Sequence, residues 1–268
     1  MSTELVENDR TTGEAFRRLA ASVDAFEGYE HPHASRVARL SDELARHFGL
    51  SRADRTSLVH AALLHDLGEM AMKRDYISRA GSLKEEERLD LARHPVIGEQ
   101  ESGRAGAERA VQLLVRWHHE WWNGAGYPDC LRAEQIPLKA RILRVADSYA
   151  ALTDSRPWRS AGTEAEARKH LTLWAGLEFD PAVVRAFLSL RDIPELRSYA
   201  RAAEPQSATP PPAPEPQTPP ATDAQSVEES AVTDEADQRE EVAGEAPPEP
   251  VEASFGQAPP ELEKSDSR

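Results

Sequence analysis

Histidine and aspartate residues occupy short motifs at or near the ends of predicted helices, a pattern suited to metal binding. Five of the nine histidines fall in these motifs. The candidate ligands are His33, His65, Asp66, His94, His118, His119 and Asp147. Imidazoles and carboxylates bind divalent transition metals, and this set holds more ligands than one tetrahedral ion requires. We therefore expect two divalent ions that share a bridging carboxylate.

Each histidine taken alone has a simpler interpretation, a core side chain hydrogen-bonded to a backbone carbonyl. Asp147 favours the metal interpretation, because helical spacing places it on one face with Ala140, Leu143 and Ala151. A carboxylate on an apolar face is costly to bury unless a cation or several donors compensate it. Asp66, inside LLHDLGE, poses the same problem. A metal ion would provide the missing positive charge at both positions.

Two cations about 3.5 to 4 Å apart suit the hydrolysis of a phosphoester. They lower the pKa of a bridging water and neutralise charge on the phosphate that is attacked. No side-chain nucleophile is then required, and the single cysteine, Cys130, has no neighbouring base that would activate it. The residues alone thus indicate a metal-dependent phosphohydrolase.

The elements that position these motifs are expected to be helices, because apolar residues recur with helical spacing and no run alternates with period two. The class is therefore all-α. A first helix is predicted to end near Gly28, a second near Gly49, and a third to begin after the capping residue Ser51 and to continue through LVHAALLHDL. Further helices are expected over residues 83–93, 107–121, 138–153, 163–175 and 181–190. Residues 123–129, NGAGYPD, predict an ordered loop.

Composition divides the 268 residues into a flexible start at 1–12, one domain at 13–200 and a tail at 201–268. The tail holds 13 of the 20 prolines, 16 acidic and 4 basic residues, and thus −12 of the net charge of −15. Such a segment buries too little apolar surface to fold, so we expect it to be disordered and to act as an interaction or solubilising appendage.

The remaining charge of −3 excludes a basic surface for a nucleic acid polymer. No apolar run approaches the roughly 20 residues that span a bilayer, and the N-terminus lacks the pattern of a signal peptide. One cysteine excludes an internal disulfide. These features predict a cytoplasmic protein without membrane association. Because no receiver or sensor segment is recognised, we expect its input from partners, metal state, oxygen or expression level.

Six motifs in a fixed order carry a resemblance to a known family. They are H-x-x-R-V (33–37), H-D-x-G (65–68), H-P-x-x-G (94–98), HHEWWNGAGYP (118–128), IPLKARILRVAD (136–147) and ALTDSRPW (151–158). An HD dipeptide alone has no specificity, but this joint order is highly specific. Over nearly all of residues 30–190 the chain resembles the HD-GYP family, a branch of the HD superfamily of metal-dependent phosphohydrolases. The fold implied is the HD-superfamily helical bundle with extra C-terminal helices.

The resemblance implies a bacterial signalling enzyme, a phosphodiesterase that hydrolyses cyclic di-GMP to the linear dinucleotide or to GMP. By motif match, the seven residues named above are the metal ligands, with Asp66 as the bridge. The ions in the family are iron, manganese or other divalent metals. Family members with three metals carry a glutamate four residues before the first histidine, where this chain has Tyr29. The resemblance therefore favours two ions.

Two departures from the family pattern bear on activity. The lysine of HD-x-G-K, which the family is expected to use against substrate phosphate, is Glu69 here, and the aspartate three residues after the last ligand is Ala150. A carboxylate facing a phosphodiester repels it. Lys73, one turn after Glu69, could reach the same anion or could pair with Glu69 on the surface. We predict Asp66, Glu69 and Lys73 as the catalytic residues.

Substrate contacts are predicted in two other motifs. Arg156 is a candidate phosphate clamp, and the alternative is a surface arginine that follows a helix. Tyr127 could stack on a base or pack against a neighbouring domain, while Gly126 and Pro128 shape the loop around it. The alternative for this loop is simple rigidity.

The family also implies partners and competing functions. GYP loops are expected to contact diguanylate cyclase (GGDEF) domains, and Trp121 and Trp122 could add to that surface, although we expect at least one of them in the core. Formation of a homodimer is a further possibility. Two alternatives to the enzyme remain: a weak or inactive protein that binds cyclic di-GMP or partners, as Glu69 and Ala150 suggest, and a phosphohydrolase of another nucleotide.

Overall fold

Helix α8 (Leu138–Leu152) is buried along almost its whole length, from Ala140 to Ala151. Its sequence LKARILRVADSYAAL has no proline or glycine, so nothing interrupts the helix. In the computed structural model, which describes residues 3–79, 81–156 and 159–199, α8 packs against α2, α3, α9 and α10. A helix enclosed in this way must find partners for its polar residues inside the protein.

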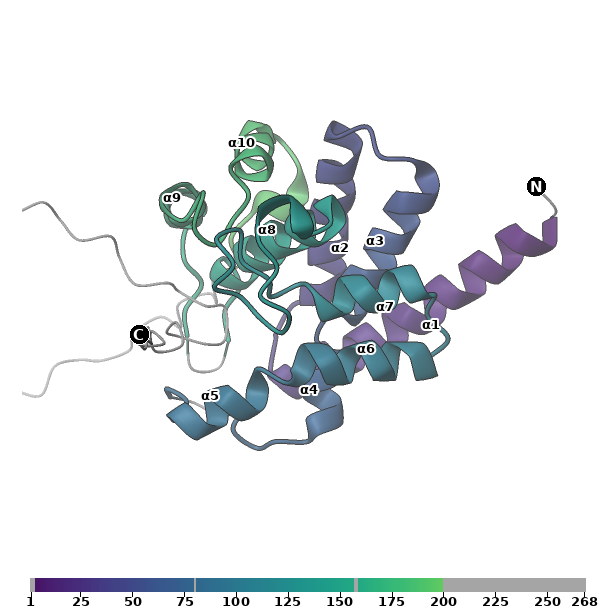
Figure 1. Ribbon diagram of the computed structural model, residues 1–268, viewed down its shortest axis with the longest axis horizontal. Coiled ribbons are helices and arrows are strands. Elements are labelled where there is room, and N and C mark those ends of the chain that lie inside the picture. The colour runs from purple at the N-terminus through teal and green to yellow at the C-terminus, as the bar shows by residue number, and fades with distance from the viewer. Residues whose placement is uncertain (1–2, 80, 157–158, 200–268) are drawn as a thin grey trace, which may run out of the picture. The chain divides into compact units, whose positions relative to one another are not determined.

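The described residues confirm the all-α class, since they form α-helices, two short 3₁₀ helices and only isolated bridges (Figure 1). The helices are α1 (Thr3–Glu27), α2 (His33–His47), α3 (Arg52–Leu64), α4 (Leu67–Met72), α5 (Glu85–Leu91), α6 (His94–Arg104), α7 (Arg109–Arg116), η1 (Ala133–Gln135), α8, α9 (Glu164–Leu173), α10 (Pro181–Ser189) and η2 (Pro194–Leu196).

Several boundaries differ from those that the sequence predicted. Helix α1 begins at Thr3, inside the segment expected to be flexible, because no proline or glycine precedes Gly13. Helix α6 was not predicted, although Pro95 occupies a first-turn position that favours proline. The helix expected over 107–121 ends at Arg116 as α7, and the chain then turns. The predicted tail at 201–268 lies outside the described residues.

The run LVHAALLHDL is divided between α3 and α4 rather than forming one helix. Ser51 caps α3 as predicted, with its hydroxyl accepting the backbone N–H of Asp54 at 3.1 Å. The chain leaves the helical conformation at Asp66, where φ is −97° and ψ is 13°. His65 and Asp66 therefore lie at a junction between two helices, where their side chains face other elements.

Close packing of α4 on α6 fixes the position of the next histidine motif. A Cβ atom at Gly68 would lie 2.0 Å from the carbonyl oxygen of His94 and 2.7 Å from the backbone nitrogen of Gly98. Only glycine permits this approach, since any side chain would push the two backbones apart. The glycine of H-D-x-G thus brings the start of α6 against Asp66.

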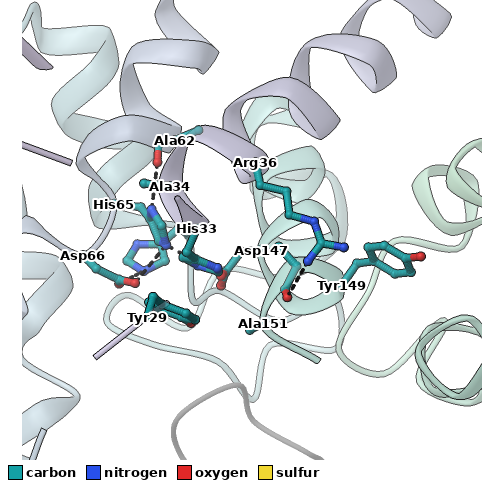
Figure 2. Close-up of polar contacts among 12 residues, drawn as sticks. Tyr29, His33, Ala34, Arg36, Ala62, His65, Asp66, Asp147, Tyr149 and Ala151 are labelled. Carbon is teal, nitrogen blue, oxygen red and sulfur yellow. Dashed lines mark hydrogen bonds and ion pairs between the residues drawn. The ribbon is translucent and has the colours of Figure 1, made fainter. Parts of the chain in front are cut away.

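Arg36 joins α2 to α8 and to the C-terminal end of the domain. Its guanidinium donates to the carbonyl oxygen of Ala150 at 3.2 Å, to Oγ1 of Thr153 at 2.8 Å and to the carbonyl oxygen of Glu195 at 2.9 Å. Figure 2 shows this side chain beside Tyr149 on α8. Because Arg36 lies one turn after His33, these bonds fix α2 against the helix that carries Asp147.

One large apolar core joins α1, α2, α3, α7, α8, α9 and α10, and a smaller cluster contains Met72, Ile77 and Leu91. Within the described part of the chain, no helix is both long enough and apolar enough to span a bilayer. Leu64 and Leu67 of the large core flank the His65-Asp66 junction, and Leu91 of the small cluster lies three residues before His94, so both clusters anchor histidine motifs.

Candidate metal centre

Asp66 lies among imidazoles that come from three different segments. Its Oδ2 atom is 2.9 Å from Nε2 of His65, which precedes it in the chain. Its Oδ1 atom is 3.5 Å from Nε2 of His94 and 3.5 Å from Nε2 of His118. The two oxygens of one carboxylate thus face separate histidines, which is the arrangement of a bridging ligand.

Asp147 provides the second carboxylate of the same cluster. Its Oδ1 atom lies 3.3 Å from Nε2 of His33 and 3.6 Å from Nε2 of His65 (Figure 2). The packing of α2 on α8 creates this proximity. The apolar face on which the sequence placed Asp147 is buried, as predicted, and the side chain is nearly enclosed.

Backbone carbonyls orient three of the histidines. The Nδ1 atoms of His65, His94 and His118 lie 2.8, 2.9 and 2.6 Å from carbonyl oxygens three residues earlier in the chain. A carbonyl only accepts, so these contacts assign a proton to Nδ1, and in the neutral ring they leave a lone pair on Nε2.

The Nε2 atoms of His94 and His118 are 3.2 Å apart. Two lone pairs that face each other at this distance are stabilised only by a shared cation or proton. The donor set therefore fits a metal ion.

Burial and neighbouring charges shift the pKa values within the cluster. Burial would lower the pKa of His65, but Asp66 and Asp147 outweigh it and hold that pKa well above its ordinary value. Burial, with the neighbouring His118, lowers the pKa of His94 to about 3. Burial would raise the pKa of Asp66 and Asp147, but the surrounding histidines outweigh it and hold both pKa values well below the ordinary range. Neutral imidazoles and ionised carboxylates ligate metals, so His94, Asp66 and Asp147 favour the required states, whereas His65 would release a proton when a metal binds.

The structure brings all seven predicted residues together. Two groups of ligand atoms lie within 4.8 Å of one another. The first group comprises one atom from each of Asp66, His94, His118 and His119, and the second comprises one atom from each of His33, His65 and Asp66. Asp66 belongs to both groups, and Asp147 contacts the second. Imidazole nitrogen with carboxylate oxygen suits iron, manganese or zinc rather than calcium.

His119 has a different partner from the other histidines. Nη1 of Arg144 lies 2.9 Å from its Nδ1 atom, and Nη2 of Arg144 donates to Glu178 at 2.6 Å. Arg144 also approaches Asp147, with 3.7 Å between Nη1 and Oδ2. The sequence analysis missed this buried pair. Its only local signal was an arginine three residues before a buried aspartate, on a helix with few polar positions.

Glu69 and Lys73 occupy different environments. Glu69 is buried in α4 with 2% of its surface exposed, whereas Lys73 is exposed at the end of that helix. The interpretation as a surface ion pair is therefore wrong, because burial removes Glu69 from the surface. Desolvation and the neighbouring Asp66 raise the pKa of Glu69 to about 8.

Arg156 is buried rather than lying on the surface, so the alternative of a surface arginine is also wrong. Its guanidinium carbon lies 3.9 Å from the ring centre of Tyr29, and it hydrogen-bonds the hydroxyl of Tyr29. Nη2 is 3.8 Å from a carboxylate oxygen of Glu27. Tyr29 in turn stacks on His33 with ring centres 4.1 Å apart. The sequence analysis did not single out Glu27.

The loop that carries the G-Y-P motif packs against His119. Tyr127 stacks on the His119 ring with centres 4.9 Å apart, and its backbone N–H donates to the carbonyl of His119 at 3.2 Å. A Cβ atom at Gly126 would lie 2.2 Å from the backbone nitrogen of Trp121. Trp121 is buried and Trp122 is half-buried, which confirms that at least one tryptophan packs in the core.

These features together define an α-helical domain in which histidines and aspartates from distant segments form one centre. The chain belongs to the HD domain family, whose model matches residues 15–183. Proteins of this family are metal-dependent phosphohydrolases. The match confirms the recognition made from the motifs.

Curated relatives share the domain but are longer proteins. The chain is 36% identical over 189 residues to a cyclic di-GMP phosphodiesterase response regulator of Xanthomonas campestris, covering 69% of this chain and 49% of that protein. It is 29% identical over 187 residues to a 3'3'-cGAMP-specific phosphodiesterase of Vibrio cholerae, covering 69% and 36%. The chain thus spans half or less of the length of these relatives.

A crystal structure of a cyclic GMP-AMP specific phosphodiesterase of Vibrio cholerae matches the fold. The TM-score is 0.52 at 21% identity, over 68% of this chain and 49% of that chain. At this identity the likeness concerns the fold alone.

Proposed function

We propose that the protein is a metal-dependent phosphodiesterase that hydrolyses cyclic di-GMP to the linear dinucleotide or to GMP in bacterial signalling. The observation that carries the proposal is the position of Asp66, whose two carboxylate oxygens face separate histidine groups. The seven residues of the centre would hold two divalent ions, iron or manganese. When bound, the ions would supply an activated water and positive charge for the phosphate.

The residues of the chain supply orientation and charge around that centre. Backbone carbonyls direct the Nε2 atoms of His65, His94 and His118 inward, so the centre is preorganised. Asp66 and Asp147 would offset the charge of the ions. We keep Arg156 as the residue proposed to contact a substrate phosphate, since it lies beside the centre and stays charged. Tyr127, Gly126 and Pro128 are proposed to shape the substrate side of the loop.

The substrate proposal draws on the relatives, whose names specify cyclic di-GMP and 3'3'-cGAMP. Both are cyclic dinucleotides with two phosphodiester bonds. A second function is favoured by the buried Glu69 beside Asp66, because an acidic side chain there offers no positive charge to an incoming phosphate. In that case the protein would bind a cyclic dinucleotide or a partner without efficient turnover. A cytoplasmic location and a contact of the loop with GGDEF domains remain predictions.

The experiment that tests the proposal follows products in anaerobically purified protein loaded with iron or manganese. Cyclic di-GMP and 3'3'-cGAMP are supplied separately, and linear and mononucleotide products are separated by chromatography. The expected result is turnover of cyclic di-GMP, lost in His118→Ala and retained in His47→Ala, a control at an exposed histidine outside the centre. Retained metal and nucleotide binding without turnover of either nucleotide would favour the binding protein instead.

A further inference from the structure

Three carboxylates converge beside the histidine-rich centre. One oxygen from each of Glu27, Asp66 and Glu69 lies within 4.8 Å of the others. Glu27 is the last residue of α1, and Glu69 lies in the first turn of α4. Only 1% of Glu27 and 2% of Glu69 is exposed, so neither carboxylate is solvated by bulk water.

The protein provides too little positive charge for this group. Nη2 of Arg156 lies 3.8 Å from Glu27, and its guanidinium also covers the ring of Tyr29. Arg156 and the nearby His65 are thus the positive side chains that offset three carboxylates.

Donors are also missing at these glutamates. Within the described residues, both carboxylate oxygens of Glu27 and Oε2 of Glu69 are buried without a hydrogen-bond partner. Buried carboxylate oxygens without donors are costly, and one guanidinium 3.8 Å from Glu27 does not replace the missing hydrogen bonds, so the arrangement calls for a bound species.

We propose that Glu27, Asp66 and Glu69 bind one further divalent cation, in addition to the two ions proposed for the histidine-rich centre. All protein ligands at this site are carboxylate oxygens, so it suits a hard cation such as Mn²⁺ or Mg²⁺. The inference rests on the proposed metal centre, because the two sites share Asp66.

The site also explains how the chain could tolerate a glutamate at position 69. A cation between Glu27 and Glu69 would turn a repulsive position into one that attracts a phosphodiester. Sequence comparison with the family favoured two ions because Tyr29 replaces the expected glutamate. Here the acidic ligands come from two residues before that position and from the helix after Asp66.

The test measures Mn²⁺ stoichiometry by equilibrium dialysis of metal-free protein followed by elemental analysis. Wild type is compared with Glu27→Gln and Glu69→Gln, which keep the side-chain shape. Glu195→Gln is the matched control, since Glu195 is also largely buried and acidic but belongs to η2 and pairs with Arg39. We expect each site variant to bind one ion fewer than wild type, and the control to match wild type.

Equal stoichiometry in wild type and both site variants would overturn the inference and would indicate that the glutamates share a proton instead. Loss of an ion in His118→Ala but not in Glu27→Gln would leave the proposed function standing and refute the additional site. No bound ion in wild type would refute both. A readout that needs no variant is Mg²⁺ titration of metal-free wild type: we expect a rise in Tm, and its absence would contradict the site.

Discussion

The guanidinium of Arg144 lies 2.9 Å from Nδ1 of His119, so this ring nitrogen must accept a hydrogen bond. The neutral ring then carries its proton on Nε2. At His65, His94 and His118 the carbonyl partners impose the opposite tautomer. Coordination through Nε2 of His119 would therefore require Arg144 to release Nδ1, whereas in the other three rings Nδ1 already holds a proton and Nε2 faces the centre.

The pair of Arg144 and Glu178 is expected to hold this part of the domain together. Arg144→Leu should lower the free energy of unfolding of the metal-free protein by about 3 to 5 kcal/mol, because it leaves a buried, unpaired carboxylate. Replacing both residues by leucine should cost less than the single change. Urea unfolding of the single variant, the double variant and wild type measures these free energies of unfolding. A double variant that is less stable than the single one would refute the explanation.

Gly68 is expected to be irreplaceable for geometric reasons. Gly68→Ala should displace the start of α6 by forcing a Cβ against the carbonyl of His94, and should reduce metal content and activity together. Gly13→Ala is the matched control: its Cβ would meet nothing closer than 3.6 Å, and the helical position should gain about 0.5 to 1 kcal/mol of stability. Elemental analysis and thermal unfolding of both variants check the pair. Normal metal content in Gly68→Ala would contradict the requirement for glycine at this position.

Glu69 should make the stability of the metal-free protein depend on pH. Its pKa rises from an ordinary 4.5 to about 8 through burial and the proximity of Asp66. The folded protein therefore holds a proton that the unfolded chain releases between these values, so stability falls as pH rises through this window. The slope is at most about 1.4 kcal/mol per pH unit for one group.

Urea unfolding in the presence of a chelator, from about pH 5 to 8, measures that slope. Glu69→Gln should flatten it, and Glu195→Gln should leave it unchanged. An identical slope in wild type and Glu69→Gln would show that Glu69 ionises normally.

Asp66→Asn should affect both histidine groups at once. An amide has one oxygen and no charge, so it cannot serve two ions. We therefore expect loss of metal and a decrease in kcat/KM of roughly a hundredfold. Asp42→Asn, outside the centre and paired with Arg55, provides the control. The values of kcat/KM and metal content are measured on the same preparations. Full metal retention in Asp66→Asn would contradict the bridging position.

Residue types and order sufficed to predict that the seven histidines and aspartates converge, because the histidines and Asp66 occur in motifs at or near helix ends and Asp147 lies on the apolar face of a helix. The buried face that carries Asp147 also followed from helical spacing with Leu143 and Ala151. Helix α6 escaped prediction because His94-Pro95 resembles the end of a helix, although proline is equally suited to its first turn.

The environment of Glu27 could not be predicted from local pattern. A glutamate just before Gly28 normally ends a helix in solvent, and its burial here arises from α4 and from Arg156, which is distant in the chain. The pairing of Arg144 with Glu178 has the same origin, because it depends on contacts between α8 and the segment that follows α9. Such contacts between distant segments leave no periodicity in the sequence.

The measurement that tests the central claim most directly is elemental analysis of protein purified anaerobically and dialysed without chelator. The account predicts at least two tightly bound transition-metal ions per chain, reduced in His94→Ala and unchanged in His47→Ala. Protein that is folded and yet retains no transition metal, or a His94→Ala variant with the full metal content, would contradict the centre on which the proposed function depends.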